Sequence, residues 1–257
     1  MIEHIQSAPP IWKYPSFQPS QKVAIFVPCY MDQFYPHAAQ SMVEILERLG
    51  IFPDFPPEQT CCGQPAFNSG YWDEARRVVR VFAHTFENYD WIICPSGSCT
   101  AMCRVFFSLL FPDNSAITDV GKRVVEFTEF LVNVLGVTDL GARFPRKVTL
   151  HIGCHGRREL GIVDQPVKLL QNVCDLEYCP LPEMEDCCGF GGTFSVKFPN
   201  ISLDMGRRKC ENIAASGAEV IASIDSSCLM HIGGILQLDA QKKRIRPLHI
   251  AEILNCR

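Results

Sequence analysis

One pattern of cysteines occurs twice in this chain and restricts the folds that it can adopt. A Cys-Cys-Gly triplet stands at residues 61–63 and again at residues 187–189, and each triplet has one distant cysteine before it and one after it. The two sets are Cys29, Cys61, Cys62 and Cys99, then Cys154, Cys187, Cys188 and Cys228. Four thiols per set match the ligand count of an iron–sulfur cluster or a closed zinc site. The fold must therefore bring together cysteines that lie far apart in sequence.

The residues around the two cysteine sets also repeat. Each copy begins with a lysine and an apolar, β-branched run that ends in its first cysteine, at residues 22–29 and 147–154. Apolar residues at helical spacing then alternate with short apolar runs typical of strands. We expect helices near residues 38–49, 75–86, 166–173 and 203–214, and strands near residues 51–55, 91–94, 176–178 and 218–224.

This alternation predicts an α/β fold of two pseudo-symmetric strand–helix repeats with mainly parallel sheets. The first cysteine, the Cys pair and the last cysteine of each copy all follow a predicted strand. They should converge at the carboxyl ends of the strands, where parallel sheets bind ligands. The expected division is an N-terminal extension over 1–21, a first cysteine-rich domain with a helical connector over 22–146, and a second cysteine-rich domain over 147–257.

Composition excludes several functional classes. The 257 residues are 47% hydrophobic, which suffices for a large core, and the net charge of −4 provides no basic field for nucleic acid. No apolar run is long enough to cross a bilayer, and residues 1–21 lack the regions of a signal peptide. In such a chain, fourteen cysteines indicate metal or redox chemistry in a reducing cytoplasm rather than a disulfide framework.

Backbone groups near the cysteines are expected to favour thiolates. Cys99 and Cys228 each stand at the N-terminus of a predicted helix, where free N–H groups favour negative charge. The glycine after each Cys pair, Gly63 or Gly189, permits the tight turn that directs two neighbouring thiols to one centre.

Other cysteines and histidines leave alternatives open. The six remaining cysteines are expected to be small buried residues, but Cys94 and Cys103 stand near the first set. Cys103 lies one helical turn after Cys99 and is an alternative ligand. His155 and His231 flank the second set, either as ligands or as packed, hydrogen-bonded neighbours.

The residues around both triplets resemble the CCG-type cysteine-rich domain, which occurs twice in one component of heterodisulfide reductase and in the iron–sulfur component of glycolate oxidase. The resemblance extends in particular to the lactate utilization protein A family and covers residues 22–257. It is carried by residues 61–70, 95–100, 187–197, 228–234 and 249–254.

The resemblance implies an iron–sulfur protein that acts with two partners, lactate utilization proteins B and C, in the oxidation of L-lactate to pyruvate. On this interpretation the chain is a cytoplasmic electron-transfer subunit of an oxidoreductase and not a stand-alone catalyst, so no catalytic residue is assigned. Any membrane association would be peripheral, through the complex. Each set of four cysteines is then expected to hold one [4Fe–4S] cluster.

One departure from the family pattern concerns the last cysteine of each set. The fullest CCG pattern ends in Cys-x-x-Cys, which gives five thiols, but Ser96 and Asp225 stand three residues before Cys99 and Cys228. A four-thiolate cluster is therefore a simpler hypothesis than a five-thiolate, non-cubane cluster. Two rival interpretations remain: a zinc-stabilised interaction module, with zinc at one site or more, and a thiol–disulfide redox enzyme similar to heterodisulfide reductase.

Overall fold

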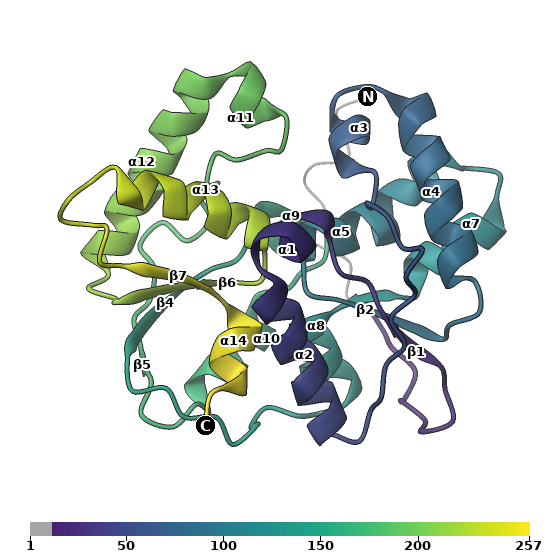
Figure 1. Ribbon diagram of the computed structural model, residues 1–257, viewed down its shortest axis with the longest axis horizontal. Helices are drawn as coiled ribbons and strands as arrows, with labels where there is room; N and C mark the ends of the chain where they lie inside the picture. Colours follow the sequence, from purple (N-terminus) through teal and green to yellow (C-terminus); the bar gives the residue numbers. More distant parts are fainter. Residues whose placement is uncertain (1–11) are drawn as a thin grey trace.

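The structure, a computed structural model, describes residues 12–257 and arranges them as two parallel sheets with helices between and outside them (Figure 1). The first sheet has the order β1 (Val23–Ile25), β2 (Trp91–Cys94), β3 (Val124–Glu126). The second has the order β5 (Glu177–Tyr178), β4 (Lys147–His151), β6 (Val220–Ser223), β7 (Arg246–His249). Every strand pairing within the described residues is parallel, which confirms the predicted α/β fold of two repeats.

The two repeats share one strand order. Asp54 forms a parallel bridge with Ala24 of β1, in the position that β5 takes beside β4. The strand expected at residues 51–55 is therefore reduced to this single bridge. Pro56 stands two residues further on, in the donor position of the next rung, and because proline has no N–H to donate, the ladder cannot extend beyond Asp54 in that direction.

Each repeat ends in an edge strand and a short helix that the sequence analysis missed. β3 leads into α8 (Phe127–Glu129), and β7 leads into α14 (Ile250–Asn255). The segment expected as a helical connector therefore contains a strand, which was overlooked because it is only three residues long.

The helices form three layers around the two sheets (Figure 1). Helices α2, α8, α10 and α14 lie between the sheets, and their apolar faces share one core with both of them. Helices α4 and α7 cover the outer face of the first sheet, and α12 and α13 cover the outer face of the second.

The remaining bounds are α1 (Cys29–Phe34), α2 (Pro36–Arg48), α3 (Gln64–Asn68), α4 (Trp72–Phe86), α5 (Gly97–Ala101), the π-helical η1 (Met102–Phe106), α6 (Phe107–Leu110), α7 (Ser115–Lys122), the π-helical η2 (Phe130–Val134), α9 (Cys154–Arg158), α10 (Asp164–Gln171), α11 (Phe194–Lys197), α12 (Pro199–Ala215) and α13 (Ser226–Gln237).

The part of the predicted N-terminal extension that is described, residues 12–21, packs on the first repeat; residues 1–11 lie outside the described residues. The rings of Trp12 and Tyr14 lie 4.8 and 5.5 Å from the Arg104 guanidinium carbon. Arg104 also forms a buried ion pair with Glu129, at 2.8 Å. These aromatic rings therefore shield the Arg104–Glu129 ion pair from solvent. Removal of either partner would leave an uncompensated buried charge.

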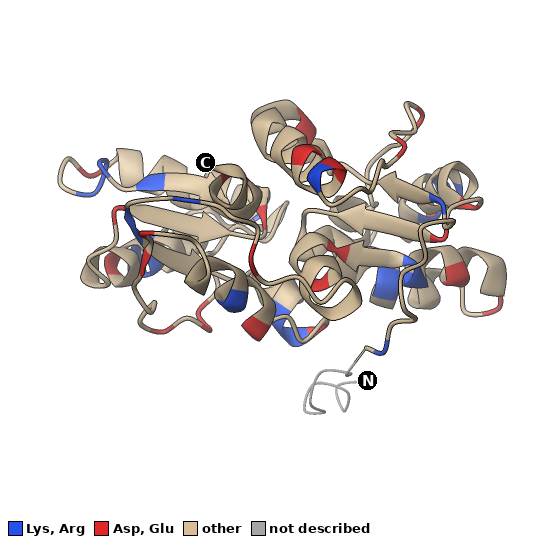
Figure 2. Cartoon of the chain, turned by 90° about the horizontal axis from the view of Figure 1, so that it is seen from below, with Lys and Arg blue, Asp and Glu red and all other residues tan. Residues whose placement is uncertain are grey.

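The surface carries charges of both signs. Lys and Arg are interspersed with Asp and Glu over both halves of the molecule (Figure 2). Within residues 12–257, the helices are all too short or too polar to cross a bilayer.

Glu126 is a fully buried carboxyl group at the N-terminus of α8. Its Oε2 atom accepts hydrogen bonds from the backbone N–H groups of Thr128, at 2.9 Å, and Glu129, at 3.1 Å. Its Oε1 atom has no hydrogen-bond partner. Burial raises the pKa of Glu126 to about 8, although the hydrogen bonds oppose this shift.

We predict that Glu126→Gln removes a pH dependence of stability. Because the pKa of Glu126 is raised on folding, the folded chain holds a proton that the unfolded chain has lost between about pH 5 and pH 8. The free energy of unfolding of the wild type should fall across this window, relative to the variant, by up to about 1.4 kcal/mol per pH unit. Urea unfolding of both proteins at several pH values measures the difference. Parallel curves would contradict the assignment.

Candidate metal centre

All eight cysteines of the repeated pattern line one cavity, where the carboxyl edges of the two sheets meet. Cys29 and Cys154 begin α1 and α9, directly after β1 and β4. Cys99 and Cys228 are the third residues of α5 and α13, after β2 and β6. The two Cys pairs lie in the loops before α3 and α11. The parallel topology thus brings each set together, and the facing arrangement of the repeats brings both sets to the same cavity.

The sulfur atoms of the first set are close to one another. The Cys29 and Cys61 sulfurs are 3.9 Å apart, and the Cys62 and Cys99 sulfurs are 3.5 Å apart. Cys62 is buried, as is Cys188 in the second set, whereas the other six cysteines of the pattern are partly or fully exposed. All fourteen cysteines are free thiols. Each set therefore has one buried sulfur and three that face the cavity with some access from solvent.

The contacts of one sulfur in each set favour its thiolate form. The Gly63 N–H donates to the Cys61 sulfur at 3.4 Å, and the Gly189 N–H donates to the Cys187 sulfur at 3.3 Å. The pKa of Cys61 is lowered chiefly because the thiol of the set's first cysteine donates a hydrogen bond to it, with smaller contributions from Cys62 and Gly63. The same contacts lower the pKa of Cys187. Each set thus has one sulfur whose surroundings favour deprotonation, and the thiolate is the form in which cysteine binds a metal.

The two positions that lack the fifth thiol of the family pattern contact each other. The Ser96 hydroxyl donates to the Asp225 carboxylate at 2.6 Å. The Ser98 N–H and hydroxyl donate to the same carboxylate at 3.2 and 2.8 Å. Asp225 is 1% exposed, and burial raises its pKa while these bonds oppose the shift. Serine and aspartate therefore form a polar junction between the repeats, three residues before the last cysteine of each set.

A second contact across the repeats lies beside this junction. The Nε2 atom of buried His249 lies 3.1 Å from the Pro95 carbonyl oxygen, and its Nδ1 atom lies 3.2 Å from the backbone nitrogen of Ala251. These partners assign the proton to Nε2, which donates to Pro95. Helices α5 and α9 also approach closely, because a Cβ atom on Gly97 would lie 3.0 Å from the Gly156 Cα atom.

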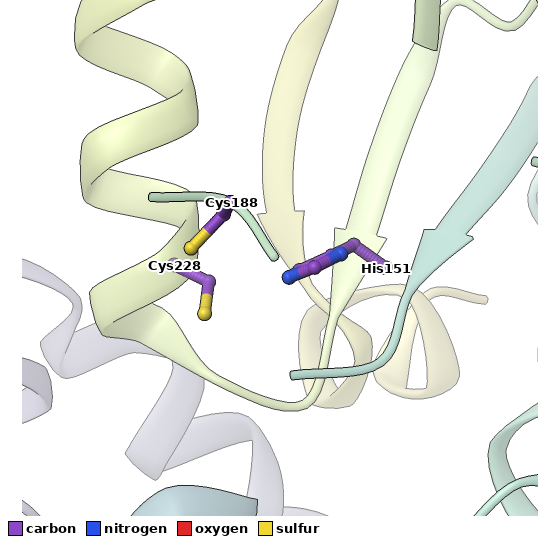
Figure 3. Close-up of side chains that lie close together, drawn as sticks. All are labelled: His151, Cys188 and Cys228. Carbon is purple, nitrogen blue, oxygen red and sulfur yellow. The ribbon is translucent and has the colours of Figure 1, made fainter. Parts of the chain in front are cut away.

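His151 is a site residue that the sequence analysis missed. It is 1% exposed at the end of β4, and neither of its ring nitrogens has a hydrogen-bond partner. One ring nitrogen and the sulfurs of Cys188 and Cys228 lie within 4.8 Å of one another (Figure 3). Burial, and secondarily Lys209, lowers the pKa of His151 to about 4, so the imidazole is neutral at pH 7. Aligning the two copies would have revealed it, because the matching residue of the first copy is Phe26.

The other candidates from the sequence take different positions. His155 lines the cavity, and its Nδ1 atom lies 3.4 Å from a Glu159 carboxylate oxygen. His231 instead faces Ser202, at 3.4 Å from its hydroxyl. Cys94 and Cys103 are fully buried and lie behind the cavity wall. Of these four residues, the structure brings only His155 to the cavity.

The donor set fits a thiolate-bound metal group. Thiolates are soft ligands that select zinc, copper(I) or iron–sulfur clusters over hard cations. The unpartnered nitrogens of His151 add a donor that also suits zinc or iron. The same sulfurs are too numerous and too close to be explained as apolar packing.

Comparison with known proteins agrees with this geometry. The family model of the cysteine-rich domain named CCG matches residues 23–104 and 148–233. The chain is 45% identical over 240 residues to Lactate utilization protein A of Bacillus subtilis, an alignment that covers 92% of this chain and 100% of that protein. It is 48% identical over 239 residues to Lactate utilization protein A of an Exiguobacterium species, covering 91% of this chain and 96% of that protein.

The fold also resembles a solved structure. A hypothetical protein from Helicobacter pylori superposes with a TM-score of 0.56 at 12% sequence identity. The alignment covers 96% of this chain and 50% of that chain, so this chain spans half the length of the solved protein. At this identity the likeness shows the fold alone.

We predict that Gly189→Ala destabilises the protein more than Gly63→Ala. Both glycines have a positive φ, of +90° and +88°, where a Cβ atom costs about 1–2 kcal/mol. A Cβ atom on Gly189 would also lie 2.5 Å from the Ser202 carbonyl oxygen, whereas the nearest atom at Gly63 is 3.6 Å away. Urea unfolding of the metal-free variants compares the two losses, and equal losses would contradict the expected clash.

We predict that Asp225→Ala lowers the free energy of unfolding by about 1–3 kcal/mol, because it leaves the hydroxyls of Ser96 and Ser98 without their acceptor in a buried place. Asp204→Ala is the matched control, since that side chain is 78% exposed. The control should change stability by no more than about 0.5 kcal/mol. A loss no larger than that of the control would refute the structural role of the junction.

Proposed function

The chain belongs to the lactate utilization protein A family of cysteine-rich-domain proteins, and from this premise and the cavity geometry we propose that it is an iron–sulfur electron-transfer subunit in the oxidation of L-lactate to pyruvate. The observation that carries the proposal is the convergence of eight free cysteines, from two repeats, on one cavity. The relatives' name supports the substrate, and the donor set supports the cofactor.

Each set of four cysteines would hold one [4Fe–4S] cluster. A bound cluster of this type supplies a one-electron redox centre. The protein's own groups prepare the two sites: the pKa values of Cys61 and Cys187 are lowered, chiefly by hydrogen bonds from the first cysteine of each set, and the N–H groups of Gly63 and Gly189 lie within hydrogen-bond distance of their sulfurs. Such hydrogen bonds to sulfur tune the redox potential.

Aromatic side chains help to exclude water from the cavity. Tyr30 of the first repeat and Phe190 of the second both line it, and their rings meet edge to face at 5.5 Å. The pair joins the two repeats across the cavity wall. Low water access protects bound clusters and strengthens electrostatic interactions within the site.

The shared cavity favours electron transfer over catalysis on lactate itself. Two redox groups held in one cavity are close enough to exchange an electron, whereas the cavity wall is rich in sulfur and carries few cations that would bind a carboxylate substrate. We therefore assign no catalytic residue to this chain. Lactate utilization proteins B and C are the proposed partners, and the free thiols are suited to a reducing cytoplasm.

A second candidate, a zinc-stabilised interaction module, is favoured by one observation. The His151 nitrogen and the Cys188 and Cys228 sulfurs lie within 4.8 Å of one another. Mixed nitrogen and sulfur ligands are common in structural zinc sites. Zinc is redox-inert, so metal analysis and spectroscopy separate the two functions.

The test is anaerobic purification of the full chain, with iron, sulfide and zinc analysis and electron paramagnetic resonance after reduction by dithionite. Two clusters predict about eight iron and about eight sulfide per chain with a reducible signal. Cys62→Ser and Cys188→Ser should each lose about half of the iron, because each removes the buried ligand of one set.

Cys174→Ser is the control, since Cys174 is exposed and lies outside the cavity lining. It should retain the wild-type iron content. Zinc without iron, even after anaerobic reconstitution, would overturn the electron-transfer proposal and leave the interaction module.

A further inference from the structure

The two repeats differ at one buried pair of side chains. Phe26 and His151 each stand three residues before the first cysteine of their set. On the covering helices, Gly63 faces Val79 of α4, and Gly189 faces Gly206 of α12 in the same way. Three residues further along these helices stand Phe82 in α4 and Lys209 in α12.

In the first repeat this pair is apolar. The rings of Phe26 and Phe82 are fully buried and meet edge to face, with centroids 4.9 Å apart. In the second repeat, His151 and Lys209 take their places and are equally buried, at 1% and 0% exposure. A polar, basic pair in the position of two phenylalanines is costly unless a group nearby compensates for it.

Neither basic side chain finds full compensation within the described residues. Both ring nitrogens of His151 are without a hydrogen-bond partner. The Lys209 ammonium donates to the Glu183 carbonyl oxygen at 2.8 Å, and no carboxylate lies within ion-pair distance of it among residues 12–257. A buried polar atom without a partner, such as each His151 nitrogen, needs an explanation, and a bound ion is one.

The sulfurs of the second set are the nearby groups of opposite character. The ring of His151 points from the end of β4 toward Cys188 and Cys228 (Figure 3). Lys209 stands one helical turn after Gly206, where a Cβ atom would lie 3.3 Å from the Cys188 carbonyl oxygen. Burial lowers the pKa of Lys209, and Asp186, followed by Cys188, Cys187 and Cys228, opposes this shift. Both basic groups therefore face the second cysteine set, and the first set has no counterpart to either of them.

We propose that a His151 ring nitrogen is a ligand to the metal group held by the second cysteine set, with the Lys209 ammonium as its buried counter-charge. The inference rests on the proposed function, in that it takes each set to bind a metal group. A nitrogen ligand and a nearby positive charge both raise the reduction potential of an iron–sulfur centre. The second group is therefore the more easily reduced of the two, and the pseudo-symmetric chain holds two unlike redox centres.

The experiment uses the full chain, reconstituted anaerobically with iron and sulfide, and measures nitrogen hyperfine coupling by pulsed electron paramagnetic resonance at partial reduction. The centre reduced first should have strong coupling to a directly bound nitrogen. His151→Phe, which introduces the residue of the first repeat, should lose this coupling and lower the potential of that centre. Lys209→Met should lower the potential but keep the coupling.

His231→Gln is the matched control, because His231 is a histidine near the second set whose Nε2 atom already lies 3.4 Å from the Ser202 hydroxyl. It should keep both coupling and potential. If His151→Phe fails to fold, wild-type protein labelled with ¹⁵N-histidine gives the same information. If a histidine nitrogen is bound directly to the centre, the label replaces the ¹⁴N coupling pattern by that of ¹⁵N. His155→Gln and His231→Gln, labelled with ¹⁵N-histidine in parallel, should retain the ¹⁵N coupling pattern.

Failure of this inference is distinguishable from failure of the proposed function. Bound iron with no histidine coupling, or coupling that survives His151→Phe, would overturn the ligand assignment while leaving the iron–sulfur function intact. If the chain binds zinc and no iron, X-ray absorption at the zinc edge tests whether a His151 nitrogen is a ligand. A zinc–nitrogen contribution lost in His151→Phe would support the assignment, and an all-sulfur zinc shell would refute it.

Discussion

The approach of the two sheets at their carboxyl edges depends on one buried carboxylate. Asp225 precedes α13 of the second repeat and accepts hydrogen bonds from Ser96 and Ser98, which begin α5 of the first. Small residues surround it: a Cβ atom on Gly153 would lie 2.5 Å from an Asp225 carboxylate oxygen, and Gly97 lies directly against α9. Because the last cysteine of each set follows this junction by three residues, the same contacts that join the repeats also position a sulfur from each.

Much of the architecture could be read from the sequence, because alternating strand and helix patterns and a repeated cysteine motif leave few topologies. The short edge strands β3 and β7 were missed, since three or four residues carry too little periodicity. That both cysteine sets line one cavity could not be predicted either. Hydrophobic patterns indicate which face of a sheet is buried, but not which other sheet lies beside it. His151 was overlooked because a single histidine in an apolar strand has no pattern of its own.

Comparison of the repeats is more informative than either repeat alone. The glycine turns, the contacts that lower the pKa values of Cys61 and Cys187, and the positions of Cys99 and Cys228 are common to both repeats, which suits the binding of similar groups. The exchange of Phe26 and Phe82 for His151 and Lys209 is not required by the fold, because the first repeat forms the same layers with an apolar pair. Under the proposed function, the shared features of the repeats would bind the two metal groups, and the differences would make those groups unlike.

The shared central core has a consequence for biosynthesis. Helix α14 packs on α2, and both lie in the layer that covers the inner face of the first sheet. During synthesis the face of α2 that packs on α14 stays uncovered until residue 255 has been added, although α2 itself is complete by residue 48. The cavity that holds both cysteine sets also needs residues of both repeats, because its lining runs from Pro28 to Cys228. The complete cavity can therefore form only after both repeats have been translated, and until then the α2 face and the free thiols of the first repeat stay exposed.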